Sequence, residues 1–169
     1  MSGAGSGHAV SLGSMAPPAI RVEERLWERA AELRRREWRA LIDELSDVEG
    51  LFESRGASLL VIDLDDQHLR VDLHAEVGTT NVTVPRRELA HLIDEYRGVI
   101  TMLGNDDNSI ARMEALDMAK KVVHDDGARR IAALLPDLSP DHETRRRFFS
   151  LVVSLAVDTT KMPWARRHL

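Results

Sequence analysis

The sequence predicts an α+β fold: an N-terminal helix, a three-stranded antiparallel meander, and a C-terminal bundle of three to four helices packed on one sheet face. Two patterns lead to this prediction. Short segments between residues 60 and 85 alternate apolar and polar residues with the two-residue period of strands. The flanking segments repeat apolar residues with the period of a helix. Because helices and strands are segregated along the chain, their order argues against βαβ units.

The first helix is predicted over residues 23–45, where apolar side chains return on one stripe. The stripe consists of Trp27, Ala31, Trp38, Leu41, Ile42 and Leu45. Most other positions are charged, and the run Arg34–Arg36 invites a nucleic-acid interpretation. Six arginines accompany seven acidic residues in this range, however, so a salt-bridged solvent face is the better explanation.

The predicted meander has one apolar face and one wet face. Its strands are centred on Leu60–Leu64, Leu69–Glu76 and Val82–Val84. A turn at Asp65–His68 joins the first two strands, Pro85 ends the third, and such short connections require antiparallel neighbours. His68 and His74 lie on the wet face, but six residues of extended strand separate them by about 20 Å, too far to share a metal ion.

Two further helices are predicted after the strands. Leu89–Leu103 carries the clearest amphipathic stripe in the chain. The next helix begins at a cap on Asn108 or Ser109, and Gly127 suits a left-handed C-cap at its end. A short separate helix is placed at residues 128–135.

The last helix is predicted to be the central, buried one. Ser139 followed by Pro140 is a typical helix start, with the side chain of the first capping and the second in the first turn. The run FFSLVVSLAV, Phe148 to Val157, is apolar nearly all round. A helix with no polar face is expected to be surrounded by other elements.

The length of 169 residues suits a single domain, which we expect to span residues 19–158. Residues 1–18 are rich in Gly, Ser and Ala, lack the features of a signal peptide, and are expected to form a flexible tail. Gly13–Met15 is typical of the junction left by an appended tag, with native sequence starting at the methionine. Residues 159–169 are expected to form a second tail.

Composition excludes several classes of function. The chain has no cysteine, which rules out disulfides, thiol nucleophiles and cysteine zinc sites and suits the cytoplasm. No apolar run approaches the roughly 20 residues of a membrane span. Nucleotide-binding, P-loop, serine-hydrolase and zinc-protease motifs do not occur, and only 4% of residues are aromatic. We therefore expect no cofactor, no metal, no nucleic acid and no membrane contact.

Charge is unevenly distributed along the chain. The formal net charge is −5, but residues 1–109 hold 12 basic and 20 acidic side chains, whereas residues 110–169 hold 11 and 8. A basic C-terminal part suits an acidic protein partner, or the acidic part of a second copy of the chain. Ordinary solvated surface charge explains so small an excess equally well.

The run EALDMAKKVVHDDGARR holds the most chemically suggestive residues. On a helix, Asp117 and His124 share a face but stand about 10 Å apart along the axis, so they form no direct dyad. Lys121 lies one turn from Asp117 and is expected to pair with it. His124 would be favoured in a last turn by the helix dipole, and Asp125 and Asp126 suit caps for a following helix. Every polar residue here thus has a structural role available.

The same run, with ETRRRFFSLVVSL beyond it, resembles the C-terminal signature of uncharacterised protein family 262, a group of small bacterial proteins. The matching positions are Glu114, Ala115, Asp117, Met118, Ala119, His124, Gly127, Arg146, Arg147, Phe149 and Leu151. Weaker similarity in LLVIDLDDQHLRVDL and HLIDEY extends the resemblance over about residues 20–157. The family implies no activity for this chain, and Val153 stands where the family often has a cysteine.

Our first hypothesis is a non-enzymatic, cytoplasmic binding or adaptor domain with a protein partner. Its candidate patch comprises Asp117, His124, Asp125, Asp126, Gly127, Arg145, Arg146 and Arg147. Arginine side chains and helix N-terminal amides there could receive a carboxylate or a phosphate. The alternative is that these arginines only pair with Asp141 and Glu143.

Two other functions remain open from the residues alone. An enzyme would use Asp117 and His124 in one pocket, beside a third polar group from another helix. A homo-oligomer would assemble through the stripe that carries Trp27 and Trp38, unless both indoles lie in the core. The absence of a catalytic motif weighs against the enzyme.

Overall fold

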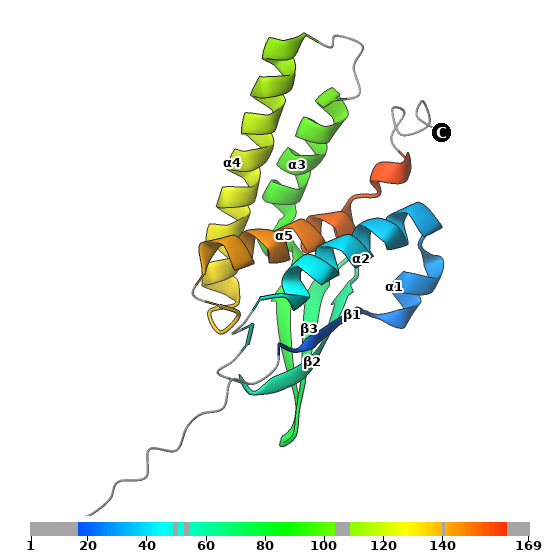
Figure 1. Cartoon of the computed structure of the whole chain (residues 1–169), viewed down its shortest axis with the longest axis vertical. Coiled ribbons are helices and arrows are strands. Elements are labelled where there is room, and N and C mark those ends of the chain that lie inside the picture. Colours follow the sequence, from blue (N-terminus) through cyan, green and yellow to red (C-terminus); the bar gives the residue numbers. More distant parts are fainter. Residues whose placement is uncertain (1–16, 49–50, 53–54, 104–108, 140, 162–169) are drawn as a thin grey trace, which may run out of the picture.

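A four-stranded sheet is covered on one face by helices, and a helical hairpin extends beyond this body (Figure 1). This arrangement confirms the α+β class. The computed structural model describes residues 17–48, 51–52, 55–103, 109–139 and 141–161. In chain order the elements are β1 (Ala19–Val22), α1 (Glu24–Arg29), α2 (Glu32–Ser46), β2 (Ala57–Leu64), β3 (His68–Ala75), β4 (Gly78–Pro85), η2 (Arg86–Glu88), α3 (Ala90–Leu103), α4 (Ile110–Leu134), α5 (His142–Ala156) and η3 (Thr159–Lys161).

The prediction of a purely antiparallel, three-stranded sheet was wrong. β2, β3 and β4 form the expected meander, but β1 adds a fourth strand that runs parallel to β2, with Ile20 opposite Leu60. Since parallel neighbours need a crossover connection, α1 and α2 serve as one, and the expectation that βαβ units are absent was wrong for residues 19–64. A strand of four residues is too short to show a convincing alternation in the sequence.

The apolar and wet faces of the sheet are confirmed. Buried side chains from every strand face the helices: Ile20, Val22, Leu60, Ile62, Leu64, Leu69, Val71, Leu73 and Val84. The predicted turn also forms, because Asp65 Oδ1 accepts hydrogen bonds from the backbone amides of Gln67 and His68, both at 2.7 Å. On the wet face Arg70 pairs with Asp63 and Asp65. No group of histidines and carboxylates in the described part of the chain is arranged to hold a metal ion.

The predicted N-terminal helix is two helices with an extended break at Ala30 and Ala31. In one continuous helix the indoles of Trp27 and Trp38 would lie about 16 Å apart along the axis. The break brings their ring centroids to 6.1 Å. Arg35 stabilises it by donating from Nε to the carbonyl of Trp27 and from Nη2 to that of Glu28, both at 2.9 Å. A tertiary contact therefore overrides good local helix propensity.

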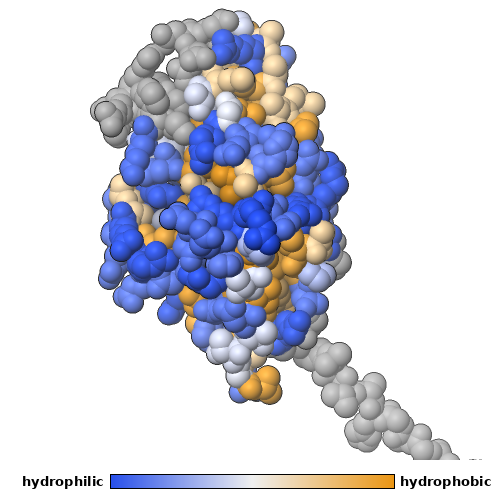
Figure 2. Space-filling view, turned by 180° about the vertical axis from the view of Figure 1, so that it is seen from behind, coloured by the Kyte–Doolittle hydropathy of each residue, from blue (hydrophilic) through white to orange (hydrophobic). Residues whose placement is uncertain are grey.

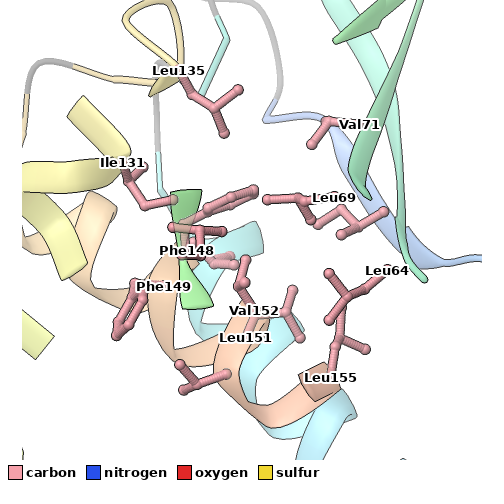
Figure 3. Packing of buried hydrophobic residues seen from close by; sticks show 14 of the residues in the cluster. Leu64, Leu69, Val71, Ile131, Leu135, Phe148, Phe149, Leu151, Val152 and Leu155 are labelled. Atoms are coloured by element: carbon pink, nitrogen blue, oxygen red, sulfur yellow. The ribbon is translucent and has the colours of Figure 1, made fainter. Parts of the chain in front are cut away.

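The last helix is buried, as its apolar sequence predicts. α5 packs between α2 and α4, and its side chains Val152 and Leu155 face the sheet residues Leu64 and Leu69 (Figure 3). Its start differs from the prediction. Asp141 is the N-cap residue, and Ser139 Oγ instead accepts from the Asp141 amide at 3.1 Å. Pro140 lies outside the described residues.

The cap of α5 gives a first testable prediction. Asp141 Oδ2 accepts from the Thr144 amide at 2.7 Å and from the Thr144 hydroxyl at 2.8 Å. We expect Asp141→Ala to lower the free energy of unfolding by about 1 kcal/mol, the usual cost of a lost N-cap. Ser109→Ala is the matched control, because Ser109 caps α4 without a side-chain hydrogen bond. Urea denaturation of both variants checks this; equal losses would contradict it.

Candidate functional site

The candidate run lies wholly inside α4, which continues without interruption from Ile110 to Leu134. The predictions of a helix end at Gly127 and of a separate helix at residues 128–135 were therefore wrong. His124 is mid-helix rather than in a last turn, and Asp125 and Asp126 cap nothing. At this level of α4 the neighbouring helix α5 packs against it, with Phe149 beside Gly127.

Gly127 of α4 lies directly against the ring of Phe149 of α5. A Cβ atom built on Gly127 would lie 2.2–2.4 Å from three ring atoms of Phe149, far inside van der Waals contact. The glycine is buried and its backbone is helical. It is therefore needed for its lack of a side chain, and not for a left-handed conformation.

His124 sits on this helix contact between two aromatic rings. Its ring meets Tyr96 of α3 edge-on at a centroid distance of 5.5 Å, and Phe149 of α5 at 5.8 Å. Nδ1 lies 2.9 Å from the hydroxyl oxygen of Ser150. Three helices therefore fix the orientation of this one side chain.

The hydrogen bonds of Ser150 determine the tautomer of His124. Its Oγ lies 3.0 Å from the backbone carbonyl of Arg146, which can only accept. The single hydroxyl hydrogen is donated there, so Nδ1–H of His124 donates to Oγ and Nε2 keeps its lone pair.

His124 is neutral over the physiological range of pH. Burial lowers its pKa to about 4, and the charges of Lys120 and Arg146 act in the same direction. Asp125 opposes these effects but does not overcome them. The ring therefore acts as a neutral hydrogen-bonding group.

A shallow, open pocket of about 350 Å³ lies beside this ring, between α4 and α5. Its lining residues are Asp117, Lys120, Lys121, His124, Arg146 and Ser150. Asp117 and His124 thus share a pocket with polar groups from a second helix, as an enzyme site would require. The expected Asp117–Lys121 ion pair is not among those that the described residues form.

Asp125 anchors the start of α5 to α4. Its Oδ1 lies 3.2 Å from His142 Nε2 and 2.9 Å from Arg146 Nε. The hydrogen bond from His142 and the positive charges around it hold the pKa of Asp125 below its usual range. Arg146 is further paired with Glu143 through Nη1 at 3.0 Å. Asp126 turns away and pairs with Arg129 on its own helix.

The three consecutive arginines do not form one patch. Only Arg146 lines the pocket. Arg147 points toward α2, where Nη1 donates to the carbonyl of Glu44 at 3.2 Å, while its Nε lies 3.5 Å from Glu143. Arg145 is half-buried on another side of α5, and its Nε makes no hydrogen bond. The alternative, in which these arginines only pair with Asp141 and Glu143, holds in part: Arg146 and Arg147 pair with Glu143, but Arg146 also pairs with Asp125.

The predicted patch omitted five residues of this site. Lys120, Lys121 and Ser150 line the pocket, and Tyr96 and Phe149 hold the histidine ring. Spacing along α4 does place Lys120 near His124, one turn away, and that signal was available. Ser150, Tyr96 and Phe149 come from other helices, so only the packing reveals them.

Comparisons with known proteins give one match. Residues 19–158 match the model of the uncharacterised protein family UPF0262, which covers β1 through the end of α5. Searches of curated proteins and of solved structures gave no significant match. Among the described helices, none is long and apolar enough to cross a membrane. The chain belongs to the uncharacterised protein family UPF0262.

Proposed function

We propose that this protein is a non-enzymatic binding domain whose α4–α5 pocket receives carboxylate groups of an acidic protein partner. The observation that carries the proposal is the charge of the lining: three cations, Lys120, Lys121 and Arg146, against one carboxylate, Asp117. Neither lysine forms an ion pair with another described residue. Arg146 already pairs with Asp125 and Glu143, so the two lysines are the groups that favour an anion from outside the fold.

The pocket is also mechanically fixed. Arg146 is held by Asp125 and Glu143, and His124 is held by Ser150 and two rings. A ligand would therefore meet groups that are already oriented, which lowers the entropy cost of binding. An anion beside His124 favours the imidazolium, so binding should raise the pKa of this histidine above its value of about 4.

Reversing one pocket charge tests the proposal. The probe is a fluorescent poly-glutamate peptide, and its affinity is measured by anisotropy at low salt. We expect Lys120→Glu to weaken binding about tenfold, because one favourable interaction becomes a repulsion in a partly buried site. Under the same conditions, NMR titration of wild type should show the His124 pKa rising when peptide is added.

Arg87→Glu is the matched control, since it makes the same charge change on a side chain that is 82% exposed and does not line the pocket. It should bind the peptide nearly as well as wild type. Equal weakening by both variants would mean that only net charge matters. No measurable binding by wild type would reject the proposal.

A second candidate, an enzyme, has one specific observation in its favour: Ser150, His124 and Asp117 line the same pocket. The proton arrangement weighs against it. Ser150 gives its hydrogen to a backbone carbonyl and receives one from Nδ1, so His124 is not placed to activate this hydroxyl. A fluorophosphonate probe discriminates the two: labelling of wild type that Ser150→Ala abolishes would favour the enzyme.

A further inference from the structure

Exposed apolar side chains are concentrated on the helical hairpin of α3 and α4. Of the large hydrophobic side chains that the described residues expose, five lie on this hairpin: Met102, Ile110, Met113, Met118 and Val122. Apolar surface shows on this protruding part of the molecule in Figure 2. Single exposed apolar residues are ordinary, whereas a set gathered on one projecting element indicates a contact surface.

Part of this set forms a regular seam on α4. Ala111, Ala115, Met118 and Val122 are all exposed and follow one another at spacings of four, three and four residues. Alternating steps of three and four keep side chains on one face of a helix and are the pattern by which one helix packs along another. The seam runs for about 16 Å along the axis. Its face is turned about 120° around the helix from the buried residues Leu116 and Val123.

The seam and its flank are self-complementary. If two α4 helices lie antiparallel with a two-fold axis near Met118, Ala115 of one copy faces Val122 of the other, so small residues meet large ones. The same axis brings Glu114 of each copy beside Lys121 of the other. Neither Glu114 nor Lys121 forms an ion pair with another described residue of its own chain. Both sets of contacts occur twice, as a two-fold interface requires.

We propose that α4 pairs with α4 of a second copy of this chain, antiparallel and centred on Met118. A seam of about three turns is short compared with the interfaces of obligate dimers. The association is therefore reversible, with a dissociation constant in the micromolar to millimolar range. The inference does not rest on the proposed binding function, because Met118 and Val122 do not line the pocket; Lys121 is the one residue that belongs to both surfaces.

Analytical ultracentrifugation of the full chain, from about 1 μM to about 1 mM, tests the pairing over this range. Wild type should pass from monomer to dimer as concentration rises. Met118→Glu places two carboxylates against each other on the axis and should weaken the dimer at least about tenfold. Val77→Glu is the matched control, since Val77 is 98% exposed in the β3–β4 turn. It should dimerise like wild type.

A charge swap tests the orientation separately. Glu114→Lys sets lysine against lysine twice and should weaken the dimer, while Glu114→Lys combined with Lys121→Glu restores opposite charges and should recover it. Circular dichroism shows whether each variant is folded. A wild type that stays monomeric throughout, or a double variant no better than Glu114→Lys, would overturn the proposal. The proposal would also be overturned if the protein stayed monomeric and floated with anionic vesicles, and if Met118→Glu abolished this flotation. That result would assign the exposed face of α4 to a lipid surface.

Discussion

Gly127→Ala is expected to lower the free energy of unfolding by about 2–3 kcal/mol, because it forces a methyl group into the ring of Phe149. The ring cannot yield easily, since Phe149 is fully buried. Alanine is the better helix former by up to about 1 kcal/mol, and that gain offsets part of the clash. The net effect is nevertheless a lower free energy of unfolding, because contacts of 2.2–2.4 Å require the helices to separate. Urea denaturation at neutral pH measures the difference.

Gly98→Ala is the matched control for this substitution. Gly98 lies within α3, and a Cβ there would meet nothing within 4 Å. The same change should therefore stabilise the protein by about 0.5–1 kcal/mol through helix propensity alone. A second check uses Phe149→Leu, in whose background Gly127→Ala should cost less, since the smaller side chain frees space. Stabilisation by both alanine variants would show that α4 and α5 do not pack as described.

The protein should lose stability between pH 6.5 and pH 4 because of His124. The pKa of His124 is about 4 in the folded state, against 6.5 for an unperturbed histidine. Between these values the unfolded chain binds a proton that the folded protein does not, so its free energy falls relative to the folded state as pH decreases. The stability contributed by the neutral ring is thus fully present above pH 6.5 and is lost toward pH 4. After allowance for partial solvent exposure, we expect this to amount to about 2 kcal/mol.

His124→Gln isolates this effect, since glutamine does not titrate and its amide can still donate to Ser150. The variant should be less stable than wild type at pH 7 through lost packing against Tyr96 and Phe149, but its stability should fall less between pH 7 and pH 4.5. Subtraction of the two profiles cancels the carboxylates, which titrate in both proteins. His91→Gln, at a side chain that is 84% exposed, is the control. Parallel wild-type and His124→Gln profiles would contradict the assignment.

The spacing of apolar residues along the chain was sufficient to predict a strand or helix wherever that spacing alone decides which side chains are buried. Alternation located β2, β3 and β4, and Asp65 marked the turn between the first two. The apolar run from Phe148 correctly predicted a buried helix. In each case the residues that carry the signal are neighbours in sequence, so the chain displays it directly.

The same spacing gave wrong helix boundaries where contacts with a distant segment decide the local backbone conformation. Glycine is typical of a helix end, yet α4 continues through Gly127, and the glycine is needed there because Phe149 of α5 occupies the space that a side chain would fill. Ala30 and Ala31 are good helix formers, yet the helix breaks, because Arg35 caps α1 and Trp27 turns back onto Trp38. The sequence offers no signal for either outcome, since the deciding partner lies on another element.

For the candidate site, too, some features follow from the sequence and others only from the packing of the helices. The sequence by itself determined the class of fold and the family, because these depend on residue types and on their spacing along the chain. Only the tertiary structure decided that His124 is neutral, which nitrogen carries its proton, and that Lys120 rather than Arg145 or Arg147 accompanies it in the pocket. Burial, charge and hydrogen bonding at this ring come from α3 and α5, and spacing along α4 carries no information about how those helices pack against it.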